Sequence, residues 1–598
     1  MPLVLCAHAI HCPGCPLIEL PYAEQLELKR NTLRRALAVY PLVARAAVSD
    51  TVAADPVTDF RLRTKLVVRG SVLGLFARGT HEVVDIPECR VLRPRLHAVA
   101  SALRRSLPLS PPLSSVDLRE ADAGVLVTVA VAEQTPAAER RTLAETIAKL
   151  EPNIVSVAVS TRDDDAPQLL GRGAEVFVGP GELRHQPDGE ATWHYAAHGA
   201  FTQAHAGQLT RLHAAIEAEI VAGAASSAGD TERGAALLRG VSVLELYAGS
   251  GALSLRLASR GARVTLVESF GPAARMAERA ASEQGLELRV LCADAAAALG
   301  ELVRAAARFD AIIVDPPRRG LAVEVRRAIA ALRPAQLVYV SCFPETFARD
   351  ASHLTLLGAR LEAATPFDMI PLSDAVETLG RFAPAEPPLP QVLAEGDAFI
   401  AVSKEPHEAT ATARAGESSL LERVRRLPGA GNAVALGELE EGASGVCLFA
   451  RGPEHAPALE RALAASHGDF TLLAHGVTHA GGKLPRMPRA DTPVRYERRE
   501  VIAGHSLLSA ALREVDLGAV GRSLALLRHP ILGDERYGDR RANLHFSHRH
   551  QLERPFLHRY ALTLKLPSGT ERIEAPLAPD LERTLASLRE RHDPGRSR

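Results

Sequence analysis

The most constraining feature of the sequence is a repeated alternation of apolar strand, turn and amphipathic helix between Phe201 and Leu361. Its clearest unit is the apolar run Val243–Leu246, which leads through a glycine-rich turn into a helical pattern at Ala252–Ser259. Strands that alternate with helices in this way are typical of a doubly wound parallel sheet. The sequence therefore predicts an α/β fold class with a Rossmann-like domain at residues 196–382.

The rest of the chain is expected to form an N-terminal region, a linker and a further domain, which makes three or four units in 598 residues. Residues 1–195 mix clustered cysteines with β-like runs and helical patterns, and we expect an α+β region there. Residues 383–390 are rich in proline, which fixes φ and indicates a stiff, extended linker. Residues 391–590 are predicted to fold as a separate domain.

Charge and composition limit the class of protein. The formal net charge is −1, so no global positive field attracts nucleic acid, and an RNA site has to be a local patch. The chain contains no run of about 18 apolar residues, and its start lacks the basic flank and long apolar core of a signal peptide. We therefore expect a cytoplasmic protein with no membrane partner. Its seven cysteines are too sparse for a disulfide framework and indicate metal binding or catalysis.

Four of these cysteines form a pattern that suits a metal. Cys6, Cys12 and Cys15 lie within ten residues of one another, and Cys89 follows far downstream. Four thiolates can close on one soft centre, either a [4Fe–4S] cluster or a tetrahedral zinc ion. The spacing alone does not decide between the two.

The α/β region carries acidic residues at the ends of its predicted strands. Gly249 and Gly251 allow the backbone to approach a ligand closely, and Glu268 follows the next strand, where a carboxylate can accept ribose hydroxyls. Asp294 and Asp315 follow the third and fourth strands, and Asp315 opens an Asp-Pro-Pro sequence. Such an edge binds a nucleoside cofactor, either NAD or S-adenosylmethionine, and the Asp-Pro-Pro tip favours S-adenosylmethionine.

A candidate nucleophile follows one strand later. Cys342 is placed at the carboxyl end of the apolar run that begins at Leu337, where it should face the same crevice. Thiolates are strong nucleophiles that need only modest activation. Glu377 lies in a segment that we expect to pass from a loop into a helix and to return to the crevice as a general base.

Taken together, these motifs resemble the RNA uridine-5-methyltransferase family over residues 1 to about 382. The resemblance is carried by the four-cysteine pattern, Asp59–Arg63 with Leu73–Phe76, the Asp-Pro-Pro-Arg motif, Ser341–Pro344 and Val376-Glu377. It implies the iron–sulfur branch, which mostly modifies large-subunit ribosomal RNA, and hence a [4Fe–4S] cluster rather than zinc. It also implies that Cys342 is the nucleophile and Glu377 the base. The cofactor-binding positions that it implies are Gln203, Tyr247, Gly249, Gly251, Glu268, Asp294 and Asp315.

The sequence departs from the family pattern at three points. The usual N-terminal β-barrel RNA-binding domain is missing, because Cys6 is nearly at the start. Ala248 replaces a frequent cysteine, and Ala375 stands where a histidine is common. The first departure leaves open how RNA would dock.

Residues 391–590 resemble a second family, the pseudouridine synthases acting on large-subunit RNA, whose fold is a mixed β-sheet with flanking helices. The similar segments are Val402–Pro406, Ala443–Ala450, His529–Asp534 with Tyr537-Gly538, and Phe556–His558. The catalytic motifs of that family are altered. Its His-Arg-Leu-Asp sequence reads Gly437–Glu440, its tyrosine is replaced at Leu472, and its Gly-Arg-Thr-His-Gln loop reads Val515–Ala519. We therefore expect an inactive, pseudouridine synthase-like α+β domain.

The resemblance implies an enzyme that methylates C5 of a uridine in RNA, most plausibly 23S rRNA and alternatively tRNA, through a cysteine–C6 adduct. Two alternatives stay open at this point. One is a non-catalytic RNA-binding or ribosome assembly factor, and the other is a bifunctional methyltransferase and pseudouridine synthase. RNA is the expected partner, and no DNA partner is expected.

Overall fold

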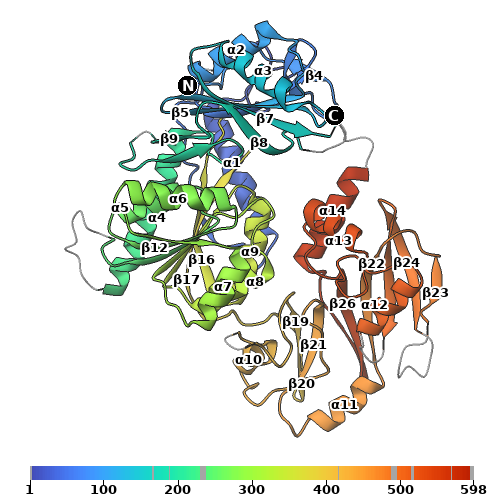
Figure 1. Ribbon diagram of the computed structural model, residues 1–598. Coiled ribbons are helices and arrows are strands. Elements are labelled where there is room, and N and C mark those ends of the chain that lie inside the picture. Colours follow the sequence, from blue (N-terminus) through green and yellow to red (C-terminus); the bar gives the residue numbers. More distant parts are fainter. Residues whose placement is uncertain are drawn as a thin grey trace. The chain divides into compact units, whose positions relative to one another are not determined.

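The computed structural model describes residues 3–163, 168–187, 189–228, 238–414, 417–485, 494–512, 517–566 and 569–592. The chain divides into two compact units, which are treated separately below (Figure 1). The first comprises Met1–Ala348 and Arg360–Pro384, and the second comprises Arg349–Ala359 and Ala385–Arg598.

The N-terminal part of the first unit is built on a seven-stranded sheet with the order β4-β3-β2-β5-β6-β7-β8. Its strands are β2 (Arg63–Arg69), β3 (Val72–Phe76), β4 (Val83–Asp85), β5 (Ser115–Ala121), β6 (Gly124–Ala132), β7 (Ile154–Arg162) and β8 (Arg172–Val178). The other elements of this part are α1 (Tyr22–Ala38), α2 (Pro94–Ser106), α3 (Ala137–Ala148) and the hairpin strands β9 (Glu182–His185) and β10 (His194–Ala197). Leu96, Val99 and Leu103 of α2 pack with Leu143 and Ile147 of α3 in the core of this part.

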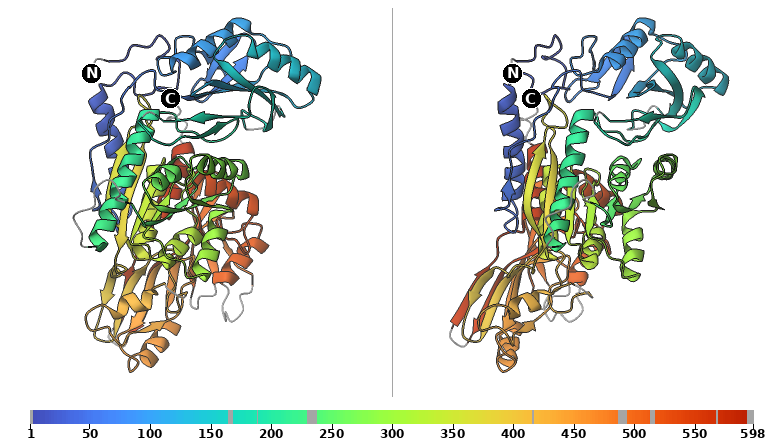
Figure 2. Two further views of the ribbon diagram at one scale, coloured as in Figure 1. Left: turned by 60° about the vertical axis from the view of Figure 1, so that its left-hand side comes forward. Right: turned by 90° about the vertical axis from the view of Figure 1, so that its left-hand side faces the viewer.

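An eight-stranded sheet with the order β1-β16-β17-β15-β14-β11-β12-β13 forms the rest of the first unit. Its strands are β1 (Ala47–Val48), β11 (Ser242–Leu246), β12 (Arg263–Glu268), β13 (Leu288–Cys292), β14 (Ala311–Val314), β15 (Gln336–Ser341), β16 (Ala359–Phe367) and β17 (Glu377–Pro384). The accompanying helices are α4 (Ala206–Ala228), α5 (Ala252–Ser259), α6 (Gly271–Glu283), α7 (Ala295–Arg304), α8 (Val323–Leu332) and the first turn of α9 (Pro344–Leu356), whose residues from Arg349 onward are counted with the second unit. Figure 2 shows α1 and α4 running lengthwise beside the strands at the β16 end of this sheet.

The sequence explains why the central strands of this sheet are parallel and buried. All four residues of β14 and all six of β15 are buried, as expected for strands covered on both faces. Leu212, Ile216 and Ile220 repeat at helical spacing along α4 and pack with strand residues in one core. Each such side chain contributes about 1.5–3 kcal/mol when it leaves water. Strands β11 to β15 are mutually parallel, so their carboxyl ends meet at one edge.

One sequence prediction in this unit is wrong. The segment around Glu377 leads from a loop into a strand and not into a helix. Glu377 is the first residue of β17, which pairs antiparallel with β15. Thr378 and Phe382 are residue types that favour a strand. Gly380 allows close packing, because a Cβ atom there would lie 2.5 Å from the ring of Phe347.

The second unit contains a ten-stranded mixed sheet among its described residues. Its strands are β18 (Val392–Glu395), β19 (Phe399–Lys404), β20 (Val434–Leu436), β21 (Ser444–Ala450), β22 (His467–Ala474), β23 (Gly481–Lys483), β24 (Arg495–Ile502), β25 (His505–Leu512), β26 (Leu557–Leu566) and β27 (Gly569–Glu574). Its helices are α10 (Leu420–Arg425), α11 (Ala456–Ala464), α12 (Leu517–Leu526), α13 (Arg540–His550) and α14 (Pro579–His592). Val515 and Asp516 of the altered loop lie outside the described residues.

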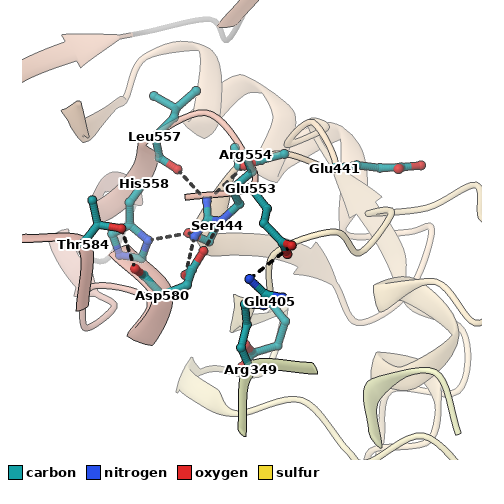
Figure 3. A network of polar contacts seen from close by, with 12 residues as sticks. Arg349, Glu405, Glu441, Ser444, Glu553, Arg554, Leu557, His558, Asp580 and Thr584 are labelled. Atoms are coloured by element: carbon teal, nitrogen blue, oxygen red, sulfur yellow. Dashed lines mark hydrogen bonds and ion pairs between the residues drawn. The ribbon is translucent and has the colours of Figure 1, made fainter. Parts of the chain in front are cut away.

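A buried arginine ties several of these elements together (Figure 3). The Arg554 guanidinium donates to both carboxylate oxygens of Asp580 in α14, at 2.6 and 2.8 Å. It also donates to Ser444 Oγ at 3.0 Å, and that hydroxyl is hydrogen-bonded to His558. A bidentate pair of this kind fixes geometry, because both partners are planar.

Among the described residues, no helix is long and apolar enough to cross a membrane.

Candidate active site

The parallel strands bring five of the predicted site residues to one edge of the sheet. Tyr247 follows β11, Glu268 ends β12, and Asp315 follows β14. Asp294 lies two residues beyond β13, and Cys342 comes directly after β15. The carboxyl edge of such a sheet is where ligands of open α/β folds bind. These residues therefore line one candidate site within the first unit.

The glycine-rich turn after β11 has two glycines with different surroundings. Gly251 has a φ of 78°, and a Cβ atom there would lie 2.9 Å from the Ala277 methyl group. Gly249 has a φ of 58°, but a Cβ atom there would meet no other atom within 4 Å. Gly251 is therefore required by helix packing, whereas Gly249 borders open space in which a ligand can approach the backbone.

Glu268 is held at the edge by backbone donors. One carboxylate oxygen accepts the Gly249 N–H at 2.9 Å, and the other accepts the Phe270 N–H at 2.6 Å. Ser269 Oγ also donates to this second oxygen at 3.4 Å, so the oxygen bound to Gly249 keeps one lone pair for a further donor such as a ribose hydroxyl.

Asp294 is exposed and caps α7, because its carboxylate accepts the Ala296 N–H at 2.9 Å. Gln203 is half-buried in the segment before α4. That segment is tied to the N-terminal sheet by the Leu62 N–H, which donates to the Ala204 carbonyl at 2.8 Å.

Cys342 and Glu377 lie on neighbouring antiparallel strands. Ser341 pairs with Thr378 at the end of the ladder. Cys342 follows Ser341 and Glu377 precedes Thr378, so both lie at this end, and the Glu377 carboxylate is close enough to raise the pKa of Cys342. Glu377 is buried, with 7% of its surface exposed. Oε1 of Glu377 has no hydrogen-bond partner among the described residues.

Burial and the surrounding charges keep the Cys342 thiol protonated when no ligand is bound. Burial, followed by the negative charges of Glu377 and Asp315, raises the pKa of the Cys342 thiol to about 11. The Arg318 guanidinium opposes this increase in pKa through its charge and a hydrogen bond. At neutral pH Cys342 is therefore a thiol, and a positive charge brought into the site would favour the thiolate.

The two carboxyls of this group are also perturbed. Burial raises the pKa of Asp315 to about 7. Burial and then the negative charge of Asp315 raise the pKa of Glu377 well above its ordinary value, and Arg318 opposes this shift. A carboxylate with a raised pKa is a stronger base once it has lost its proton.

Sequence reasoning gave no role to two residues at this site. Arg318 belongs to the Asp-Pro-Pro-Arg motif and is the cation that acts on both Cys342 and Glu377. Glu245 lies inside β11, where burial raises its pKa to about 8 and Ser254 Oγ donates to its carboxylate. A glutamate within the apolar run Val243–Leu246 was the signal that could have revealed the second residue.

The four-cysteine set lies in one region of the first unit, where Cys6, Cys12, Cys15 and Cys89 are each half-buried. Burial, followed by the neighbouring Cys89, Cys12 and Cys6, raises the pKa of Cys15 to about 12. The Arg61 guanidinium lies close enough to lower the pKa values of Cys15 and Cys89. As placed, however, the described residues include no group of three or more His, Cys, Asp or Glu side chains that could hold a metal ion.

Several known RNA methyltransferases are similar to this chain. The family described as Conserved hypothetical protein 95 matches residues 231–361. The 23S rRNA (uracil(1939)-C(5))-methyltransferase RlmD of Pseudomonas fluorescens is 31% identical over 393 residues, which cover 63% of this chain and 79% of that protein. An uncharacterized RNA methyltransferase of Geobacter sulfurreducens is 28% identical over 392 residues, which cover 62% of this chain and 76% of that protein.

A solved structure also matches. It is the tRNA (uracil-54, C5)-methyltransferase of Pyrococcus abyssi in complex with S-adenosyl-L-homocysteine, with a TM-score of 0.49 and 24% identity. The match covers 62% of this chain and 86% of that chain.

Together with the strand-edge site, the relatives define the class of this protein as a methyltransferase. The chain belongs to the RNA uracil-C5-methyltransferase family.

Proposed function

We propose that this enzyme methylates C5 of a uridine in large-subunit ribosomal RNA with S-adenosylmethionine as methyl donor. The observation that carries the proposal is the placement of Cys342 and Glu377 at one end of the β15–β17 pair, beside the strand end that bears Asp315. The relative from Pseudomonas fluorescens, which is named for a 23S rRNA uracil, supports the substrate class. A base has to leave its stack to reach a site at the edge of the sheet, so a uridine in a loop or a single strand is the expected target.

The proposed chemistry solves an electronic problem, because C5 of uracil is too weak a nucleophile to take a methyl group directly. The Cys342 thiol first loses its proton to solvent. The thiolate then forms a bond to C6, and the electron pair of the C5–C6 double bond moves into an enolate. C5 then attacks the methyl carbon of S-adenosylmethionine, the bond between that carbon and sulfur breaks with its electron pair left on sulfur, and S-adenosylhomocysteine is the leaving group. Glu377 accepts the C5 proton, the double bond re-forms, and the bond between C6 and Sγ breaks to release the thiolate. Covalent catalysis of this kind replaces one difficult step with several easier ones.

The residues at the edge fit a nucleoside sulfonium. Gly249 leaves space beside the backbone, one carboxylate oxygen of Glu268 keeps a free lone pair for a hydroxyl, and Asp294 is exposed. S-adenosylmethionine supplies the methyl group on a positively charged sulfur. Because that charge would also favour the thiolate of Cys342, we propose that the methyl donor binds before the cysteine attacks.

We also propose that the four-cysteine set holds a [4Fe–4S] cluster. Supporting this, the thiols of Cys12, Cys15 and Cys89 are close enough to affect one another's pKa. Arg61 places a positive charge beside Cys15 and Cys89, and its Nε has no hydrogen-bond partner among the described residues. Such a charge suits a site of four thiolates, which has excess negative charge. The proposed chemistry gives the cluster no step to perform.

For the second unit we propose a pseudouridine synthase-like domain that docks RNA and makes no pseudouridine. Glu438 and Glu440 are both exposed. Glu438 stands where the similar family has an arginine, and Glu440 stands where it has the nucleophilic aspartate. Five arginines are exposed on or near α12 and α13, and none forms an ion pair with another described residue: Arg522, Arg528, Arg536, Arg540 and Arg541. Unpaired arginines are suited to phosphate contacts.

The experiment that tests the proposed function is mass-spectrometric mapping of methylated uridines in RNA from cells with and without the gene. We expect one 5-methyluridine to disappear from large-subunit ribosomal RNA when the gene is absent and to return with the wild-type gene. Restoration by a Cys342→Ala variant would instead favour a non-catalytic assembly factor. Loss of a pseudouridine as well would show that the second unit is active.

A further inference from the structure

The segment that leads to Glu377 has neither helix nor strand structure of its own. It runs from residue 368 to residue 376 and connects β16 to β17. Oε1 of Glu377 is buried and accepts no hydrogen bond from any described residue. The position of the carboxylate therefore depends on where the backbone enters β17.

The start of this segment is fixed by helix α1. Asp368 is fully buried and forms an ion pair with the fully buried Lys29. Its other oxygen accepts the Tyr22 hydroxyl at 2.8 Å, and that hydroxyl accepts the Ala54 N–H at 2.6 Å. Lys29 Nζ also donates to the Ile370 carbonyl at 3.2 Å.

A second contact fixes the middle of the segment. Leu372 has a φ of 67°, which is uncommon for a residue with a branched side chain and has to be imposed by its surroundings. Its carbonyl accepts the Leu17 N–H at 3.0 Å. Its side chain is buried and packs with Ile18, Val57 and Phe60.

A buried ion pair is weak evidence of stabilisation, because removing two charges from water costs about as much as their attraction returns. The pair between Lys29 and Asp368 is better explained by the precision with which it holds the backbone. Lys29 reaches the segment at two points, Asp368 and Ile370, and this fixes the direction of the chain toward Glu377.

We infer that Lys29 and Tyr22 of α1 are positioning residues for the proton-abstraction step, acting on Glu377 through Asp368 and the segment 368–376. This inference rests on the proposed covalent function. Its consequence is selective. Disturbing the contacts should slow release of the cysteine–RNA adduct, which needs Glu377, more than formation of the adduct, which needs Cys342.

Tyr22→Phe and Lys29→Met test the inference in single-turnover reactions of the full chain with substrate RNA and S-adenosylmethionine. Adduct is measured on denaturing gels, and free methylated RNA is measured by mass spectrometry. Tyr22→Phe removes only the hydroxyl that joins Asp368 to Ala54, so it remains informative if Lys29→Met fails to fold. Leu33→Ala is the matched control, because Leu33 is fully buried in the same helix and makes no contact of this network.

We expect adduct formation to stay within about twofold of the wild-type rate and adduct release to slow by on the order of 10-fold or more, since a misplacement of about 1 Å can cost on the order of 10²-fold. Leu33→Ala should lower the melting temperature without changing the ratio of adduct to product. Equal slowing of both steps, or unchanged release, overturns the inference.

Glu377→Gln in parallel separates this inference from the proposed function. If Glu377→Gln traps the adduct and neither α1 variant slows its release, only the positioning role is wrong. If Glu377→Gln traps no adduct, the covalent function is wrong and the inference falls with it.

Discussion

Cys342 and Glu377 lie at the same end of an antiparallel strand pair, next to the paired residues Ser341 and Thr378. This register brings a thiol and a carboxyl close together although they are 35 positions apart in the numbering. The pair is surrounded by Asp315, which raises both pKa values, and Arg318, which lowers them. The acidic and basic neighbours thus set the protonation of the nucleophile and of the base together.

The two glycines of the β11 turn should respond differently to substitution. Gly251→Ala forces a Cβ atom to within 2.9 Å of Ala277 and should destabilise the fold by about 1–3 kcal/mol, which includes the strain of a positive φ. Gly249→Ala has the same backbone strain but no clash, so it should fold more stably than Gly251→Ala and lose affinity for S-adenosylmethionine. Thermal unfolding and calorimetric titration measure the two effects. Equal stability of the two variants would contradict the packing argument.

The stability of the first unit should fall as the pH rises. Burial raises the pKa of Asp315 from an ordinary value of 3.8 to about 7, so the folded state holds this proton more tightly than the unfolded state. The contribution of this proton to the unfolding free energy has its full value below about pH 4 and is lost as the pH rises through 7. Chemical denaturation should therefore give an unfolding free energy that is about 2 kcal/mol lower at pH 8 than at pH 5 from this group alone.

Asp315→Asn should remove that part of the pH dependence, whereas Asp294→Asn should keep it, because Asp294 is an exposed carboxyl at the same sheet edge. A pH profile that is identical in wild type and Asp315→Asn would show that this carboxyl is not protonated at neutral pH in the folded state.

Much of the site could be predicted because it follows from local pattern. Apolar runs that end in Glu268, Asp315 or Cys342 identify strand ends, and parallel strands bring these ends together. The strand character of Glu377 was missed, because a strand that pairs with a distant neighbour has little local signal. The ion pair of Lys29 with Asp368 joins residues 339 positions apart and depends on tertiary packing alone. No pattern in either segment predicts it.

The four-cysteine set should bind iron. Anaerobically purified protein should be brown and contain about four irons per chain, as expected for a cubane cluster held by four thiolates. Cys12→Ser should bleach the protein, whereas Cys292→Ser should not, because Cys292 is an exposed thiol at the end of β13. Metal analysis that finds stoichiometric zinc and no iron would contradict the cluster.

The exposed arginines of the second unit should contribute phosphate contacts. Replacing Arg540 and Arg541 together by Gln should weaken RNA binding and reduce the slope of log affinity against log salt by up to about 2, since each phosphate contact contributes about 0.7–0.9. Arg572→Gln is the control, because its guanidinium is already paired with Asp469 and Glu574. Filter binding at several salt concentrations gives the slopes. An unchanged slope in the double variant would exclude these arginines from the RNA interface.

The central claim is that Cys342 forms a covalent bond to the target uridine and that Glu377 is needed to release it. The most direct measurement is intact mass spectrometry of denatured Glu377→Gln protein after incubation with substrate RNA and S-adenosylmethionine, followed by mapping of the modified peptide. The account predicts a protein–RNA adduct whose mass includes one added methyl group and whose attachment point is Cys342. The adduct should persist when Cys292→Ala is added and vanish when Cys342→Ala is added. Methylated RNA formed by Cys342→Ala at more than about a hundredth of the wild-type rate would contradict the account, because covalent participation is expected to contribute more than that.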